Sequence, residues 1–215
     1  MATDRTAESP GQPSALPADH TAPARGRPRS FDREAALARA VDLFWERGYE
    51  ATSVADLTAA MGIRPPSLYA AFGDKRSLFE AAVASYQQSH GVTLPRALDE
   101  GPTVRAGIER MLRAAAAEYT DPAHPWGCLL TSSTVNCTAP EVEQAMREVR
   151  NANVRALASR IRADVAAGHE PPGTDAAALA VFVGTVLQGM SQRARDGATR
   201  AELEQVAEFA MRAWP

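Results

Sequence analysis

The sequence predicts an all-α protein, on the evidence of three observations. From Phe31 onward, apolar residues recur at helical spacing, and glycine and proline fall between these segments. The few β-branched residues show no sustained alternation of the kind that indicates strands. With 215 residues, of which 45% are apolar, the chain can bury the core of one domain or of two small ones.

The first 24 residues are predicted to form a disordered extension. They contain four prolines among small and polar residues, and Leu16 is their only large aliphatic residue after Met1. Such a segment cannot bury enough apolar surface to offset the entropy that it would lose on ordering.

The first predicted helix runs from Asp32 to Arg47. Asp32 suits the N-cap position because its carboxylate accepts hydrogen bonds from backbone N–H groups, and Gly48 suits the position that ends the helix. The residues at helical spacing that are expected to be buried are Ala36, Ala40, Leu43 and Phe44.

Two short helices are predicted next. Ser53 begins the second helix, where Asp56 three residues later suits a capping box, and Gly62 ends it. Pro65 takes the first position of the third helix, which needs no backbone N–H, and Gly73 ends that helix.

Longer helices are predicted after these. Asp74 caps a fourth helix that continues toward His90, and the chain changes to longer helices past Pro95. The helix that contains Phe182 is apolar on more than half of its circumference, so a second surface is expected to cover it. The expected ranges are Thr103–Tyr119, a short helix near Trp126–Thr134, Glu141–Ala167, Thr174–Arg195 and Arg200–Trp214.

The distribution of charge singles out the region of short helices. The chain carries 23 Lys+Arg against 26 Asp+Glu, so no global basic excess indicates a nucleic-acid partner. Residues 24–76 have the only positive balance, with nine basic against seven acidic residues. There Arg25, Arg27 and Arg29 alternate with glycine and proline in an arm that suits a DNA groove, although solvated basic arms are also common.

The second and third predicted helices match a helix-turn-helix. This layout places its later helix in a DNA major groove, although structural helix hairpins look similar. Lys75 and Arg76 add a second signal, because they occupy the first turn of the fourth helix, where the helix dipole disfavours cations. A phosphate bound at the same helix N-terminus would offset that cost.

The run from Thr52 to Phe79, TSVADLTAAMGIRPPSLYAAFGDKRSLF, resembles the signature of the TetR family of transcriptional regulators. The resemblance spans nearly thirty positions and is punctuated by Gly62 and Gly73. It includes the pattern Leu68, Tyr69, Phe72, Lys75 and Leu78. The stretch LQGMSQRARDGATRAEL is similar to a ComR-like subgroup, as are Gly127, Cys128 and Leu129.

The resemblance implies a homodimeric repressor that a small effector releases from a palindromic or near-palindromic DNA operator. Residues 25–76 would form the helix-turn-helix domain, and residues 77–215 would form a helical domain that binds the effector and makes the dimer. An adaptor that binds only protein would use the same amphipathic helices, but it would not need the basic arm or Lys75.

Family positions carried onto this chain imply a set of DNA contacts. Thr52, Tyr69 and Lys75 would reach phosphates, and Arg64 and Ser67 would lie nearest the base edges.

The chain departs from the family's pattern before the serine, where it has Pro65 and Pro66. Neither has a backbone N–H, so packing against a thymine methyl group is expected instead of a phosphate bond. The predicted DNA-contacting residues are Arg27, Arg29, Thr52, Arg64, Pro65, Ser67, Tyr69 and Lys75.

An effector pocket and a dimer interface are predicted in the later helices. Phe182 and Val186 are expected at the dimer interface. The apolar residues expected to face inward and line the pocket are Met111, Tyr119, Trp126, Leu129, Phe182 and Met190.

Catalysis, a cofactor and a metal site are not predicted. The chain has no Gly-x-Ser-x-Gly elbow, phosphate-binding loop or His-Glu-x-x-His motif. His20, His90 and His169 sit near tails or loops and are expected to form no cluster. The longest apolar stretch, residues 176–190, is shorter than a membrane span and no leader opens the chain, so a cytoplasmic protein is expected.

The two cysteines, Cys128 and Cys137, match no zinc ribbon or redox pair in their spacing. Cys128 follows His124 by four residues, which would suit a metal or redox sensor on one helical face. The prolines on either side place His124 before the helix, however, so burial of the cysteines as small apolar groups is expected.

Overall fold

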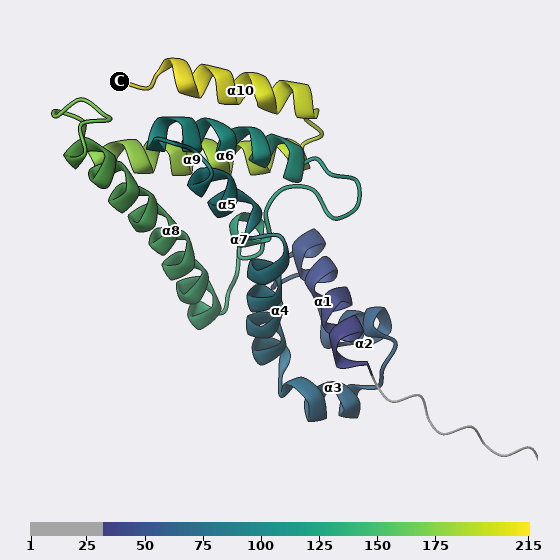
Figure 1. Ribbon diagram of the computed structural model, residues 1–215. Helices are drawn as coiled ribbons and strands as arrows, with labels where there is room; N and C mark the ends of the chain where they lie inside the picture. The colour runs from purple at the N-terminus through teal and green to yellow at the C-terminus, as the bar shows by residue number, and fades with distance from the viewer. Residues whose placement is uncertain (1–31) are drawn as a thin grey trace, which may run out of the picture. The chain divides into compact units, whose positions relative to one another are not determined.

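Helices joined by turns make up the described part of the chain (Figure 1). The structure, a computed structural model, describes residues 32–215. Those residues form ten helices and no strand, which confirms the predicted all-α class. The predicted disordered extension, residues 1–24, and the arm with Arg25, Arg27 and Arg29 lie outside the described residues.

The first four helices begin and end where their capping residues predict. Asp32 accepts two backbone N–H groups at the start of α1. Ser53 and Asp56 form the expected capping box, and Gly62 ends α2 in the left-handed conformation with φ of 67°. The four helices are α1 (Arg33–Arg47), α2 (Val54–Met61), α3 (Pro65–Phe72) and α4 (Lys75–Ser89).

A small apolar core holds α2 and α3 on the pair formed by α1 and α4. Leu57 and Leu68 are completely buried, and Phe72 is buried beside them. Phe44 of α1 packs edge-on against Phe79 of α4, with 5.1 Å between the ring centroids. This packing fixes the orientation of α3 relative to the longer helices.

The later helices follow the predicted pattern with one addition. The helix α5 is missing from the prediction, which treats Pro95 as a break. Pro95 is the third residue of α5, where its missing N–H removes no hydrogen bond within the helix. The helices are α5 (Thr93–Asp99), α6 (Val104–Glu118), α7 (Leu129–Ser132), α8 (Pro140–Ala166), α9 (Ala176–Arg195) and α10 (Arg200–Arg212).

Helix α9 packs mainly against α6, α8 and α10 and also touches α7, and α10 packs along α6 (Figure 1). Helix α4 runs through the predicted domain boundary at residues 76 and 77 and contacts α7, and residues 32–215 form one unit. The boundary between a DNA-binding domain and an effector domain therefore remains a prediction. Within the described range, no helix combines the length and the apolar character that crossing a membrane requires.

Candidate nucleic-acid interface and regulatory region

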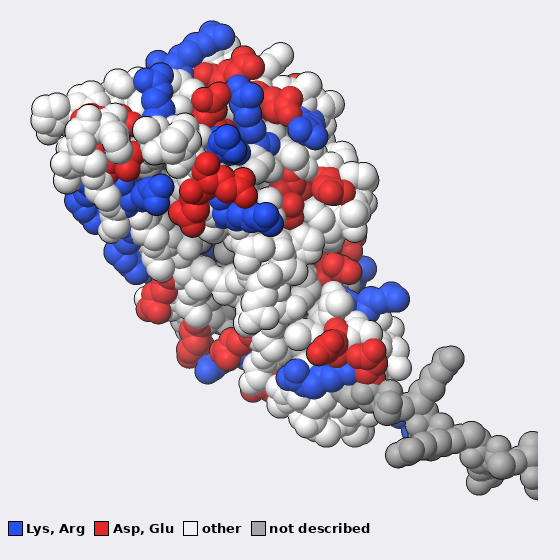
Figure 2. All heavy atoms as spheres, in the orientation of Figure 1, with Lys and Arg blue, Asp and Glu red and all other residues white. Residues whose placement is uncertain are grey.

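Helix α3 divides its residues between a buried and an exposed face. Leu68 and Phe72 pack into the core, whereas the side chain of Tyr69 is 52% exposed. The structure brings together on the exposed side four of the residues predicted to contact DNA: Arg64, Pro65, Ser67 and Tyr69. Acidic and basic side chains are interspersed over the face of the molecule shown in Figure 2. DNA binding by α3 would therefore depend on individual side chains of this helix and not on the charge of a whole face.

The first four residues of α3 offer no free backbone donor for a phosphate. Pro65 and Pro66 occupy its first two positions and have no N–H. The N–H groups of Ser67 and Leu68 both donate to the Arg64 carbonyl oxygen, at 2.9 and 3.2 Å. Recognition by α3 must therefore come from side chains, of which the exposed Arg64 makes no capping hydrogen bond.

Thr52 does not lie on this surface. The residue is completely buried, and its Oγ1 donates a 2.6 Å hydrogen bond to the carbonyl oxygen of Gly48. The prediction that Thr52 reaches a phosphate is therefore wrong for this arrangement, because the hydroxyl joins the end of α1 to the start of α2. Sequence position alone does not distinguish this internal bond from an outward one.

Lys75 lies in the first turn of α4, as predicted, and its side chain interacts with two residues of the same chain. Its Nζ lies 4.2 Å from the centroid of the Tyr49 ring, and the nearby Glu50 carboxylate attracts it. Partial burial lowers the pKa of Lys75, and the charge of Glu50 opposes that shift. The helix dipole disfavours a cation at this position. The Tyr49 ring and the Glu50 carboxylate offset part of that cost, so a bound phosphate is not needed to offset all of it.

Arg195, the last residue of α9, ties that helix to the end of α1. Its guanidinium donates to the carbonyl oxygens of Trp45 at 3.1 Å and Glu46 at 2.8 Å. These carbonyl groups belong to the last turn of α1, where carbonyl oxygens have no N–H partner within the helix. Nothing in the sequence around Arg195 indicates this contact, because its partners are backbone groups about 150 residues away.

Replacement of Arg195 by alanine is expected to destabilise the fold by about 1 to 2 kcal/mol, because two carbonyl groups lose a charged donor. Arg193→Ala is the matched control, since Arg193 is exposed and its ion pair with Asp196 lies at the same helix end. Its expected cost is less than about 0.5 kcal/mol. Urea unfolding followed by circular dichroism compares the two, and equal losses would show that the Arg195 contacts contribute nothing.

The residues predicted to line an effector pocket differ in their exposure. The core encloses four of them: Met111, Tyr119, Leu129 and Met190. Trp126 is 40% exposed and lines a surface hollow of about 340 Å³ together with Glu46, His124, Pro125 and Arg195. The expectation that Phe182 faces inward is wrong. Phe182 lies on the second apolar face of α9, which points to solvent in the described chain.

The two cysteines lie in different surroundings. Cys128 is 9% exposed and is the N-cap of α7, where its sulfur accepts a hydrogen bond from the Tyr86 hydroxyl at 3.4 Å. Burial raises the pKa of both Tyr86 and Tyr119, and the nearby Cys128 sulfur adds to each shift. The observed burial of Cys128 agrees with the packing interpretation, and Cys137 is half-buried.

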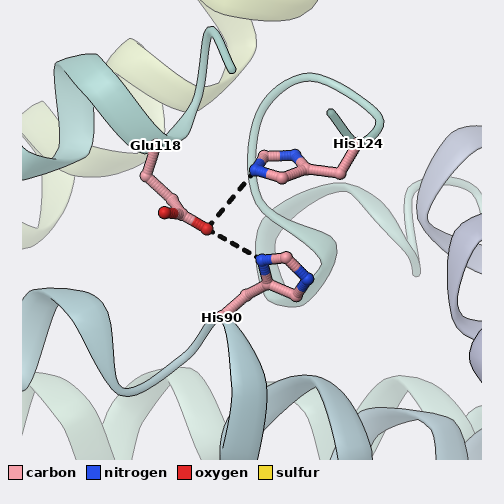
Figure 3. Close-up of side chains that lie close together, drawn as sticks. All are labelled: His90, Glu118 and His124. Atoms are coloured by element: carbon pink, nitrogen blue, oxygen red, sulfur yellow. Dashed lines mark hydrogen bonds and ion pairs between the residues drawn. The ribbon is translucent and has the colours of Figure 1, made fainter. Parts of the chain in front are cut away.

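The expectation that His90 joins no cluster is wrong. His90, Glu118 and His124 converge from three separate segments (Figure 3). The loop from Tyr119 to Cys128 folds back so that His124 meets the end of α4, a tertiary contact that residue spacing does not reveal. His124 does precede its helix, as predicted.

Comparison with known proteins decides the family. Residues 36–82 match the model for bacterial regulatory proteins of the tetR family, and residues 104–210 match the tetracyclin repressor-like C-terminal domain. The chain belongs to the TetR family. This TetR chain is 36% identical to the HTH-type transcriptional repressor ComR of Escherichia coli over 194 residues, or 89% of this chain and 92% of ComR.

Two further relatives agree with this assignment. The repressor BdcR of Escherichia coli is 32% identical over 172 residues, which cover 80% of this chain and 83% of BdcR. A solved structure of the TetR regulator CifR, a cysteine mutant bound to 26-base-pair double-strand operator DNA, is 44% identical with a TM-score of 0.84. That match covers 88% of this chain and 100% of the CifR chain. These relatives are transcriptional regulators and not enzymes, and dimers that respond to effectors are typical of the family.

Proposed function

We propose that this protein is a homodimeric transcriptional repressor that binds a palindromic or near-palindromic operator through α3 and leaves it when a small effector binds. The observation that carries the proposal is the exposed face of α3, where Arg64, Ser67 and Tyr69 stand on a helix held by a conventional helix-turn-helix core. A location in the cytoplasm, where the operator DNA is, belongs to the same proposal.

Each side chain on α3 has a role that its chemistry supports. Arg64 and Ser67 are the donors nearest to base edges in the major groove, and the ring of Pro65 suits a thymine methyl group. Tyr69 has an exposed hydroxyl that suits a phosphate oxygen, which fixes position without reading sequence. Sequence specificity in this proposal rests on Arg64, Ser67 and Pro65, which are the residues assigned to base edges.

A dimer surface is available on α9 and α10. The exposed fractions are 57% for Val181 and 36% for Phe182 on α9, and 64% for Phe209 on α10. Large exposed apolar groups on two helices that pack together favour burial by a partner. A second copy is the expected partner, because two recognition helices are needed to read two half-sites one DNA turn apart. Val186 is partly buried beside this surface.

Lys75 provides a test of phosphate contact. Lys75→Ala is expected to weaken binding to operator and to random duplex by similar factors, because a phosphate contact carries no sequence information. The slope of log K against log salt should fall by about 0.9 for each chain of the dimer. Arg96→Ala is the control, because Arg96 is an exposed cation of α5 paired with Glu100. If the salt slope is the same in Lys75→Ala and wild type, Lys75 touches no phosphate.

Gel shifts on the DNA upstream of its own gene, over a salt series, test the proposed function. A repressor should bind that DNA more tightly than a random duplex, and its affinity should fall steeply with salt. A helical adaptor would bind neither duplex under the same conditions. That outcome would overturn the proposal.

A further inference from the structure

His90, Glu118 and His124 form a three-residue cluster beside α1 (Figure 3). His90 is the C-cap of α4, Glu118 is the last residue of α6, and His124 lies in the loop that follows. Glu118 Oε1 is 2.9 Å from His90 Nδ1 and 3.4 Å from His124 Nε2. One carboxylate oxygen therefore faces two imidazole nitrogens.

The hydrogen bonds of His124 determine which of its nitrogens is free. His124 Nδ1 lies 3.0 Å from the carbonyl oxygen of Pro125, which can only accept, so Nδ1 carries the hydrogen. In a neutral ring, Nε2 then directs its lone pair toward the Glu118 carboxylate. An imidazole nitrogen and a carboxylate oxygen, both ligand atoms that first-row transition metals accept, therefore lie side by side.

We propose that His90, Glu118 and His124 bind a divalent first-row transition metal ion, such as Zn²⁺ or Cu²⁺, and that this ion is the effector. The second half of the statement rests on the proposed repressor function. Two imidazoles and a carboxylate suit these ions, whereas Mg²⁺ and Ca²⁺ prefer oxygen ligands throughout and Cu⁺ prefers sulfur. Three protein ligands leave one position for water or a small ligand.

The geometry and the surroundings of the cluster fit such an ion. The three ligand atoms lie within 4.8 Å of one another, and bonds of about 2.0 to 2.2 Å require separations of about 3.3 Å, so small side-chain shifts suffice. The bond from His124 to the Pro125 carbonyl is the kind of contact that orients a metal-binding histidine. His124 also lines the 340 Å³ surface hollow, which gives solvent ions a route to the cluster.

Trp45 provides a second, independent observation at the cluster. The residue is completely buried on α1, its ring stacks on His124 with centroids 4.5 Å apart, and it lies 5.0 Å from the ring of His90. Its Nε1 is a buried donor without a hydrogen-bond acceptor among the described residues. Buried donors of this kind are rare in folded proteins, and although an ion itself cannot accept from Nε1, a water molecule in its open fourth position would be an acceptor at the cluster.

The position of the cluster links an ion to the DNA-binding helices. His90 ends α4, which begins directly after α3, and Trp45 belongs to α1, which packs along α4. Glu118 and His124 belong to α6 and the loop after it. An ion held by all three would fix the end of α4 relative to α6. Such an ion can change operator affinity if it binds one arrangement of these helices better than another.

The metal site is tested by dialysis of the untagged full chain, first against chelator and then against micromolar Zn²⁺ or Cu²⁺, followed by measurement of bound metal. One ion per chain is expected, with nitrogen ligands visible in the electron paramagnetic resonance spectrum of the Cu²⁺ form. His124→Gln and Glu118→Gln should each weaken binding by about 100-fold or more. His169→Gln, at an exposed histidine outside the cluster, and Cys128→Ser with Cys137→Ser should retain it.

Failure of wild-type protein to bind a stoichiometric ion would overturn the site, whatever the variants do. Full binding by both cluster variants, or loss of binding in the cysteine variant, would also overturn it. The effector role is tested by operator gel shifts with and without Zn²⁺ or Cu²⁺, where a change of about tenfold is expected. A bound ion that leaves operator affinity unchanged overturns the effector role, whereas absence of operator binding in every condition overturns the repressor function alone.

Discussion

Replacement of Phe182 by glutamate is expected to give monomers that no longer bind the operator specifically. Phe182 belongs to the apolar surface of α9 and α10, and a carboxylate placed there would be buried without a partner in the dimer. A single recognition helix per molecule contacts only one half-site, so the expected loss of operator affinity is about 100-fold or more. Sedimentation velocity and a gel shift on the same sample measure both effects.

Val135→Glu is the matched control for this experiment. Val135 is 64% exposed, and it follows α7 rather than lying on α9 or α10. The variant adds the same charge to an exposed apolar position, so it should remain dimeric and bind DNA like wild type. An intact dimer in Phe182→Glu would place the interface elsewhere. Monomers in both variants would mean that any added charge disrupts the assembly.

Gly127→Ala is expected to cause a large loss of stability, because the added methyl group meets both a strained backbone conformation and a neighbouring helix. Gly127 has φ of 84°, and a Cβ there would lie 2.8 Å from the carbonyl oxygen of Ser191 on α9. The backbone strain costs about 1 kcal/mol and the contact with a backbone oxygen adds more, so a total of about 3 kcal/mol is expected. Chemical unfolding measures it.

Gly168→Ala separates the two contributions. Gly168 has φ of 79°, but a Cβ there would meet nothing within 4 Å. Its expected cost is about 1 kcal/mol, which reflects the backbone conformation alone. Equal losses in the two variants would contradict the close approach of the loop at Gly127 to α9. The same approach positions His124 and Arg195, so this result bears on the regulatory region as well.

The helix boundaries of the N-terminal part could be predicted because their signals are local. Asp32, Ser53 and Gly62 each act on backbone groups within four residues, so the sequence around them contains the necessary information. Pro95 misled the prediction because a proline in the first turn of a helix looks the same in sequence as one that ends a helix.

The candidate sites were only partly predictable, because long-range contacts decide them. Helix periodicity is enough to predict that Tyr69 is exposed and Leu68 is buried on α3. It cannot show that the Thr52 hydroxyl turns inward, or that Arg195 reaches the end of α1. The cluster of His90 with His124 depends on how one loop folds back on α4, and their separation in sequence gives no sign of it.

The central claim is that α3 reads an operator as part of a dimer, and selection of genomic DNA fragments by the purified protein tests it most directly. The expected result for wild type is an enriched site with two inverted half-sites about one helical turn apart, centre to centre. Arg64→Ala, tested in parallel, should bind the same site with relaxed preference at one base pair in each half-site, at a cost of about 1 to 3 kcal/mol per contact. Two results would contradict this role of α3. The wild-type protein could enrich no common sequence, or the base preference could stay unchanged in both Arg64→Ala and Ser67→Ala.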